Sequence, residues 1–261
     1  MLLGFHHVTA FASDPQRNLD FYTQCLGLRL VKRTVNYDDP ATWHFYFGDR
    51  TGSPGSLLTF FAWPTAPAGR PGAGQATKIR LASPRGSGAV KDPAGLELDC
   101  IHSDQPRIQS VILRVAEAGP TEQFLTEMLG FKPAAPNRFD LAGSILEIIE
   151  APPGMPRAKL STGSIHHIAF RTADAASQLE WRAKLKAAGV RVTRVIDRQY
   201  FKSIYFREPG GVLFEIATDG PGFLIDEPAD ALGSSLKLPP WLEPIRESIE
   251  RRLAPLDGER R

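Results

Sequence analysis

The sequence predicts an α+β fold built from repeated βαβββ modules that form curved mixed sheets, with the second module truncated. Three observations support this prediction. An alternating apolar strand, a capped helix and a glycine follow one another near the start of the chain, in its middle and near residue 165. Short runs rich in β-branched and aromatic residues follow each helix. Residues 76–103 hold only a part of the pattern.

The first module, residues 1–64, begins with the apolar run VTAFAS, and a helical pattern follows that ends at Gly27. The Asp14 carboxylate can accept amide hydrogens of the first helical turn, and Pro15 suits the first helical position. Gly27 tolerates the left-handed exit from a helix. Three β-like runs, LRLVKRTV, TWHFYFG and GSLLTFFA, complete the module.

The last module, residues 163–219, repeats this order, with Asp174 as the helix cap, Gly189 as the stop and the runs RVTRVID, SIYFRE and GVLFEIA. A third copy, at residues 107–151, has the strand, the helix, the glycine and a last strand. Residues 76–103 have room for a first and a last strand only, so we predict that the second module lacks its helix and hairpin.

The remaining residues, 220–261, form a tail in which we expect a surface crossing and then a helix from about Pro240 to Leu253, packed as a lid or brace.

Composition excludes several classes of function. Basic residues outnumber acidic ones by only 31 to 29 and are scattered, which argues against nucleic acid or a membrane surface as a partner. The start, MLLGFHHV, lacks the pattern of a signal peptide, and no apolar run approaches the roughly 20 residues of a membrane helix. We therefore expect a cytoplasmic protein whose two cysteines are buried thiols.

Paired histidines enter the first strand of the first and last modules, as His6-His7 and His166-His167. Because neighbouring residues of a strand face opposite sides, one histidine of each pair should face the concave side of the sheet. The other should face the helix layer or a rim. Two further histidines, His44 among them, fit ordinary strand or loop positions.

A carboxylate completes a candidate metal site. Glu215 lies in the apolar run VLFEIA, where a lone ionised carboxylate would be costly. The repeat places Thr59 at the equivalent position of the first module. Two histidines and one carboxylate, His7, His167 and Glu215, form the facial set that leaves open positions and suits non-haem Fe(II). A set of four protein ligands would instead favour a Lewis-acid isomerase.

The two middle modules lack the histidines. Gln109-Ser110 and Thr77-Lys78 occupy the corresponding positions, although Glu147 and Asp99 stand where the last module has its glutamate. We predict that any site of these modules is vestigial.

The segments HHVTAF, LRLVKRTVNYDD, HHIAF and YFKSIYFREPGGVLFEIATD resemble the vicinal oxygen chelate superfamily (glyoxalase/bleomycin resistance/extradiol dioxygenase), and within it the hydroquinone-type ring-cleaving dioxygenases. The likeness covers nearly the whole chain, including the DEP and LPP segments of the tail. It implies a glyoxalase-like fold and O₂-dependent, Fe(II)-dependent extradiol cleavage of a hydroquinone or related aromatic diol, with Mn(II) as the other candidate metal.

Roles carried over by position follow from the resemblance. His7, His167 and Glu215 would bind the metal, and the first and last modules would pair around it. The neighbouring histidines would act as outer donors, and three polar residues would line the substrate and oxygen side; these five are His6, His166, Thr9, Arg198 and Tyr205.

Two other functions remain open on the same fold: a glyoxalase-like isomerase or lyase with a non-redox metal, and a non-catalytic protein that binds an aromatic compound. Similar proteins carry the second module whole, so its truncation here should expose part of a sheet. We predict a homodimer that covers it.

Overall fold

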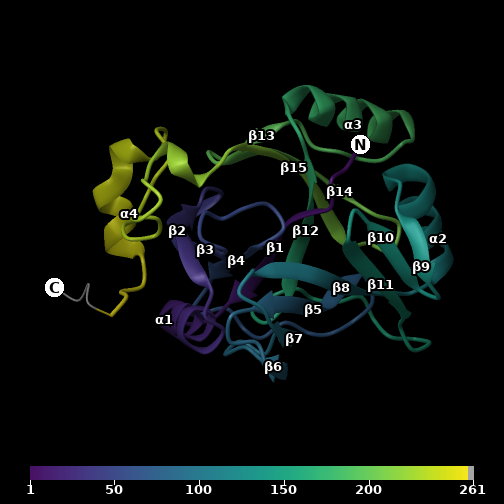
Figure 1. Cartoon of the computed structure of the whole chain (residues 1–261), viewed down its shortest axis with the longest axis horizontal. Coiled ribbons are helices and arrows are strands. Elements are labelled where there is room, and N and C mark those ends of the chain that lie inside the picture. Colours follow the sequence, from purple (N-terminus) through teal and green to yellow (C-terminus); the bar gives the residue numbers. More distant parts are fainter. Residues whose placement is uncertain (258–261) are drawn as a thin grey trace.

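The computed structural model describes residues 1–257, and its strands form two mixed sheets (Figure 1). The first sheet has eight strands in the order β13-β14-β15-β12-β1-β4-β3-β2. Their bounds are β1 (Phe5–Ala12), β2 (Arg29–Asn36), β3 (Asp39–Gly48), β4 (Leu57–Ala62), β12 (Ile165–Thr172), β13 (Ile196–Asp197), β14 (Phe201–Arg207) and β15 (Leu213–Pro221). This sheet therefore holds the strands of the first and last modules.

The second sheet has seven strands in the order β6-β7-β5-β8-β11-β10-β9. Their bounds are β5 (Gln75–Ser83), β6 (Gly88–Lys91), β7 (Glu97–His102), β8 (Arg107–Val115), β9 (Lys132–Ala135), β10 (Arg138–Leu141) and β11 (Ser144–Glu150). It combines the second and third modules. The predicted α+β class with curved mixed sheets is confirmed.

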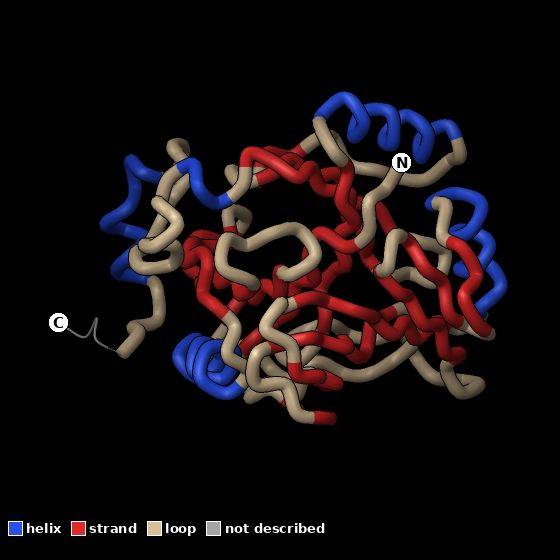
Figure 2. The backbone as a smooth tube through the Cα atoms, in the orientation of Figure 1, coloured by secondary structure: helices blue, strands red, loops and turns tan. Residues whose placement is uncertain are grey.

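Helices lie on the outside of the strands (Figure 2). They are α1 (Pro15–Asp20) continued by the π-helical turn η1 (Phe21–Cys25), α2 (Ala118–Gln123) continued by η2 (Phe124–Leu129), α3 (Ala175–Ala187), the 3₁₀ turns η3 (Phe223–Ile225) and η4 (Glu243–Ile245), and α4 (Arg246–Arg252). Within residues 1–257, no helix has the length and apolar character that spanning a membrane requires.

The predicted caps are confirmed. Asp14 accepts a hydrogen bond from the Arg17 amide, and Asp174 accepts one from the Ser177 amide. Gly27 has φ 72° in the left-handed region, as the exit from the first helix requires.

Two predictions about elements need correction. The truncated second module is not two strands alone, because the short strand β6 forms an antiparallel hairpin with β7. The tail helix α4 covers only Arg246–Arg252, because Pro240 and Pro244 favour turns before it. Residues 258–261 of the predicted tail lie outside the described part of the chain.

The tail braces the edge of the first sheet. Leu236 bridges to Arg33 of β2, and the Trp43 indole of β3 donates to the Ala254 carbonyl oxygen at 2.7 Å. The side chain of Lys32 on β2 is completely buried, and its Nζ lies 2.5 Å from Asp226 Oδ1 and also contacts Glu227. The DEP segment of the tail therefore neutralises a buried ammonium group.

We expect Lys32→Met to lower the free energy of unfolding by about 3–5 kcal/mol, because it leaves the buried Glu227 and the partly buried Asp226 without a cation. Urea unfolding at neutral pH measures this loss. Lys91→Met is the matched control, since its ion pair with Glu97 is exposed and should change stability by about 1 kcal/mol or less. Equal losses in both variants would contradict the structural role given to the tail.

Candidate metal centre

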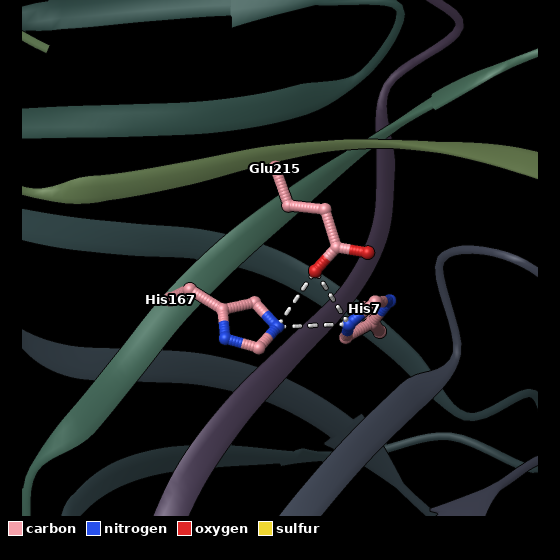
Figure 3. Close-up of side chains that lie close together, drawn as sticks. All are labelled: His7, His167 and Glu215. Atoms are coloured by element: carbon pink, nitrogen blue, oxygen red, sulfur yellow. Dashed lines mark hydrogen bonds and ion pairs between the residues drawn. The ribbon is translucent and has the colours of Figure 1, made fainter. Parts of the chain in front are cut away.

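Three side chains from three neighbouring strands meet at one point in the first sheet. His7 comes from β1, His167 from β12 and Glu215 from β15, and all three point toward one another (Figure 3). The two Nε2 atoms lie 3.1 Å apart, and Glu215 Oε2 lies 2.8 Å from His167 Nε2 and 3.5 Å from His7 Nε2. All three residues are buried. The structure thus brings together the three predicted ligands.

These distances suit a shared cation. Ligand atoms about 2.1 Å from one metal ion at right angles lie about 3 Å from each other. Each histidine presents its Nε2 edge to the shared point, while Glu215 Oε1 accepts a hydrogen bond from Ser203 and Oε2 has no hydrogen-bond donor. Buried acceptor atoms that converge without donors need a positive charge between them.

Within each histidine pair, the two Nδ1 atoms lie within hydrogen-bond distance of each other. His6 Nδ1 lies 2.9 Å from His7 Nδ1, and His166 Nδ1 lies 2.8 Å from His167 Nδ1. A histidine that offers the lone pair of Nε2 to a metal carries its proton on Nδ1, and must donate that proton. His6 and His166 are then the acceptors of these bonds, whereas the sequence suggested outer donors.

The expectation that paired histidines face opposite sides is wrong. Along the antiparallel pair β1–β12 the register shifts twice, between Phe5 and His7 on β1 and between His167 and Ile165 on β12. His6 and His166 are therefore the extra residues of two β-bulges. A bulge re-aims the side chain, which lets adjacent histidines touch through their rings.

Burial controls the charge of these groups. It lowers the pKa of both His6 and His166 to about 3, with the adjacent histidine adding to the effect in each case, so both rings are neutral acceptors at neutral pH. Burial opposes ionisation of Glu215, but attraction to His7 and His167 outweighs it and holds the pKa of Glu215 well below its usual value. The carboxylate is therefore ionised in the folded protein.

A cavity of about 230 Å³ opens beside the three groups. Roughly 150 Å³ is enough to hold a benzene ring. Aromatic side chains form much of its wall: Phe11, Tyr37, Tyr46, Phe61, Trp63, Phe201 and Tyr205. His166 lines this cavity, but His6 does not. The site is thus a pocket with a largely aromatic wall beside a convergent polar cluster.

The remaining predicted site residues also line the cavity. Thr9 Oγ1 lies 2.8 Å from Thr59 Oγ1. Arg198 Nε donates to the Tyr205 hydroxyl at 3.0 Å, and its Nη1 lies 3.0 Å from Asp38 Oδ2. Burial raises the pKa of Tyr205, so its hydroxyl stays protonated.

Sequence reasoning missed part of the wall. His44 was expected to fit an ordinary strand or loop position, yet it lines the cavity, as do Phe61 and Trp63. The period-2 pattern of TWHFYFG places His44 on the same face as Tyr46. Nothing in the sequence separates a core face from a cavity wall.

The geometry invites comparison with known proteins. The family model described as "Glyoxalase/Bleomycin resistance protein/Dioxygenase superfamily" matches residues 4–79 and 107–216. The chain belongs to this superfamily. A relative from Bacillus subtilis named "Putative ring-cleaving dioxygenase MhqE" is 38% identical over 94% of this chain and 96% of its own length.

Two further likenesses support membership of the superfamily. A protein from Sphingobium indicum named "Chlorohydroquinone/hydroquinone 1,2-dioxygenase" is 30% identical over 96% of this chain and 95% of its own length. A crystal structure from B. subtilis described as a "putative dioxygenase" superposes with a TM-score of 0.91 at 35% identity, over 98% of both chains. Maize glyoxalase I shares the fold, with a TM-score of 0.59 at 15% identity over 83% of this chain and 92% of its own.

The glyoxalase-superfamily repeat also explains the absence of a second cluster among the described residues. In the second sheet, Asp99 and Glu147 occupy the positions equivalent to Glu215, since each pairs in parallel with the first strand of its module. Arg80 Nη2 lies 2.8 Å from Asp99, and Arg138 Nη2 lies 3.7 Å from Glu147. Arginine here supplies the positive charge.

We expect Fe(II), added without oxygen, to raise the melting temperature, because a ligand at 100 times its Kd adds about 2.7 kcal/mol to the stability of the folded state. Glu215→Gln should remove most of this shift, as measured by thermal unfolding with and without the metal. Glu147→Gln changes the equivalent residue of the second sheet and should leave the shift intact. A shift lost in Glu147→Gln, or absent from the wild type, would contradict the assignment.

Proposed function

We propose that this protein is an Fe(II)-dependent, extradiol-type ring-cleaving dioxygenase that acts on a hydroquinone or related aromatic diol with O₂. The observation that carries the proposal is the convergence of His7, His167 and Glu215 beside an aromatic-lined cavity whose wall includes both histidines. Two histidines and one carboxylate leave open positions for substrate and O₂.

The relatives support the class of reaction. Proteins named ring-cleaving dioxygenases match this chain along almost its whole length, and one is named for hydroquinone and chlorohydroquinone. An aromatic diol suits the cavity, since its ring can stack on the apolar wall while one hydroxyl reaches the polar end.

Fe(II) is the proposed metal, with Mn(II) as the alternative, and the buried ligand atoms without donors fit either ion. When bound, the metal supplies the redox chemistry by which O₂ attacks an electron-rich ring. Both oxygen atoms enter the product as one ring bond breaks, so no separate reductant is consumed.

The protein's own groups then have distinct roles in the proposal. His6 and His166 orient the two ligand histidines by accepting their Nδ1 protons. Only His166 also lines the cavity, so we assign to it, and not to His6, the exchange of a proton with the substrate. Phe201 covers the rings of His6 and His7, with centroids 4.9 and 5.2 Å away, and excludes water from them.

Arg198 and Tyr205 act as a unit in this proposal. Because the Tyr205 oxygen accepts from Arg198, its own proton is free to reach a substrate oxygen. The Arg198 charge stabilises an oxyanion that forms there. Thr9 also lines the cavity, and its hydroxyl is hydrogen-bonded to that of Thr59.

A Lewis-acid isomerase of the same superfamily would gain from a fourth ligand. Here the register pairs Thr9 with Thr59 as it pairs Ala169 with Glu215, so Thr59 occupies the equivalent of the glutamate. Its hydroxyl is engaged by Thr9, which disfavours the isomerase.

The Fe(II)-loaded protein should consume one O₂ per hydroquinone and give a ring-opened product that carries both labelled atoms of ¹⁸O₂. Oxygen uptake, ultraviolet spectra and mass spectrometry measure this. His166→Ala should lower kcat at least 100-fold, because a positioned proton-transfer group contributes about 10²–10⁴-fold. His102→Ala is the control, since His102 is exposed and away from the cavity. Turnover without oxygen would instead identify an isomerase, and tight diol binding without any turnover a binding protein.

A homodimer remains a prediction, as does the cytoplasmic location. The edge strands β6 and β9 of the second sheet are largely exposed, and exposed edges pair readily. Light scattering should give twice the mass of one chain. Ala89→Pro on β6 should lower that mass if this edge forms the interface, whereas Ala134→Pro on β9 tests the other edge. A wild-type protein that is monomeric by light scattering would contradict the predicted homodimer.

A further inference from the structure

His44 lies in the wall of the cavity and is held in one orientation. It comes from β3, and only 9% of its surface is exposed. Its ring packs against Tyr46 and Phe61, with centroids 4.1 and 4.4 Å away. These two contacts restrict the orientation of the imidazole.

One edge of the ring is fixed by a hydrogen-bonded line of hydroxyl groups. His44 Nε2 lies 3.0 Å from Thr59 Oγ1, which lies 2.8 Å from Thr9 Oγ1. This line crosses the sheet from β3 through β4 to β1, the strand that also carries His7. Thr59 thus keeps the imidazole in place.

The other ring nitrogen has no partner. Within residues 1–257, His44 Nδ1 makes no hydrogen bond, although the residue is nine-tenths buried and lines the cavity. Burial lowers the pKa of His44 well below its usual value, so the ring is neutral and Nδ1 can make one hydrogen bond. Because protein atoms do not fully enclose Nδ1, it is accessible from the cavity, where a ligand can pair with it.

The position of His44 indicates which part of a ligand it would meet. It stands on β3, two strands away from β1, and strands lie about 4.8 Å apart, so about 10 Å separate the two backbones. His44 on β3 and His7 on β1 both line the cavity. A ring with one oxygen at the metal end would therefore direct its opposite position toward β3.

We propose that His44 Nδ1 binds the hydroxyl group at the far end of the substrate ring, which makes His44 a specificity-determining residue for para-diols over diols with adjacent hydroxyls. This inference rests on the proposed function for the identity of the ligand. It adds a residue and a direction of binding to that function.

Two substitutions separate the nitrogens of the ring. The amide of His44→Gln reaches the position of Nε2 and keeps the bond to Thr59, but it removes Nδ1. The amide of His44→Asn reaches the position of Nδ1 and loses the bond to Thr59. Calorimetric titration of the Fe(II)-loaded proteins without oxygen compares hydroquinone with phenol, which lacks the distal hydroxyl.

Wild type should bind hydroquinone roughly tenfold more tightly than phenol, as one buried hydrogen bond provides. His44→Gln should bind the two alike, with phenol affinity unchanged, and His44→Asn should retain most of the preference. A preference that survives in His44→Gln, or one that disappears in Tyr46→Phe instead, overturns the proposal, as does a wild type without preference. A preference without oxygen uptake would refute the proposed reaction and leave the role of His44 standing.

Discussion

The ionised carboxylate of Glu215, buried in the first sheet, is the constraint on which the rest of the site depends. Burying a charge without a partner costs far more than a single mutation usually does. Ser203 donates a hydrogen bond to Oε1, and the Nε2 atoms of His7 and His167 lie 3.5 and 2.8 Å from Oε2. The two histidines therefore compensate the buried carboxylate, and a cation bound among the three groups would compensate it further.

That requirement fits the strand order. β15 is hydrogen-bonded to β12, and β12 to β1, so the pairing of the first and last modules places all three groups together. The second sheet pairs its modules in the same way through β5 and β8, and carries acidic residues at the same positions. There, Arg80 and Arg138 provide positive charge near the surface, where forming an ion pair requires little desolvation of the charged groups.

Much of this arrangement could be predicted from the sequence, because residues close together in the chain define each copy of the repeat. Caps such as Asp14 and the glycines at helix ends mark the modules, and equivalent positions in the repeat identify the two histidine pairs and Glu215. Other features depend on contacts between strands. The bulges at His6 and His166 follow from the register of β1 with β12, which no local pattern encodes.

The same distinction explains the other misses. Whether an apolar face packs in a core or lines a cavity depends on what covers it, so Phe61, Trp63 and His44 could not be assigned from alternation alone. The strand β6 was missed because its four residues, GAVK, are too few to show a period.

The truncation of the second module reaches the site only indirectly. Every residue that lines the cavity lies within 7–63 or 166–205, in the first and last modules. The second sheet nevertheless supports the bulge beside His7, since the Phe5 amide donates to Ser144 Oγ at 2.8 Å and the Ile108 amide donates to the Gly55 carbonyl oxygen. Gly55 in turn donates its amide hydrogen to the His6 carbonyl oxygen at 2.7 Å. These contacts come from the third module, which is whole, so the shortened second module leaves both the cavity wall and the support of the metal-facing strand in place.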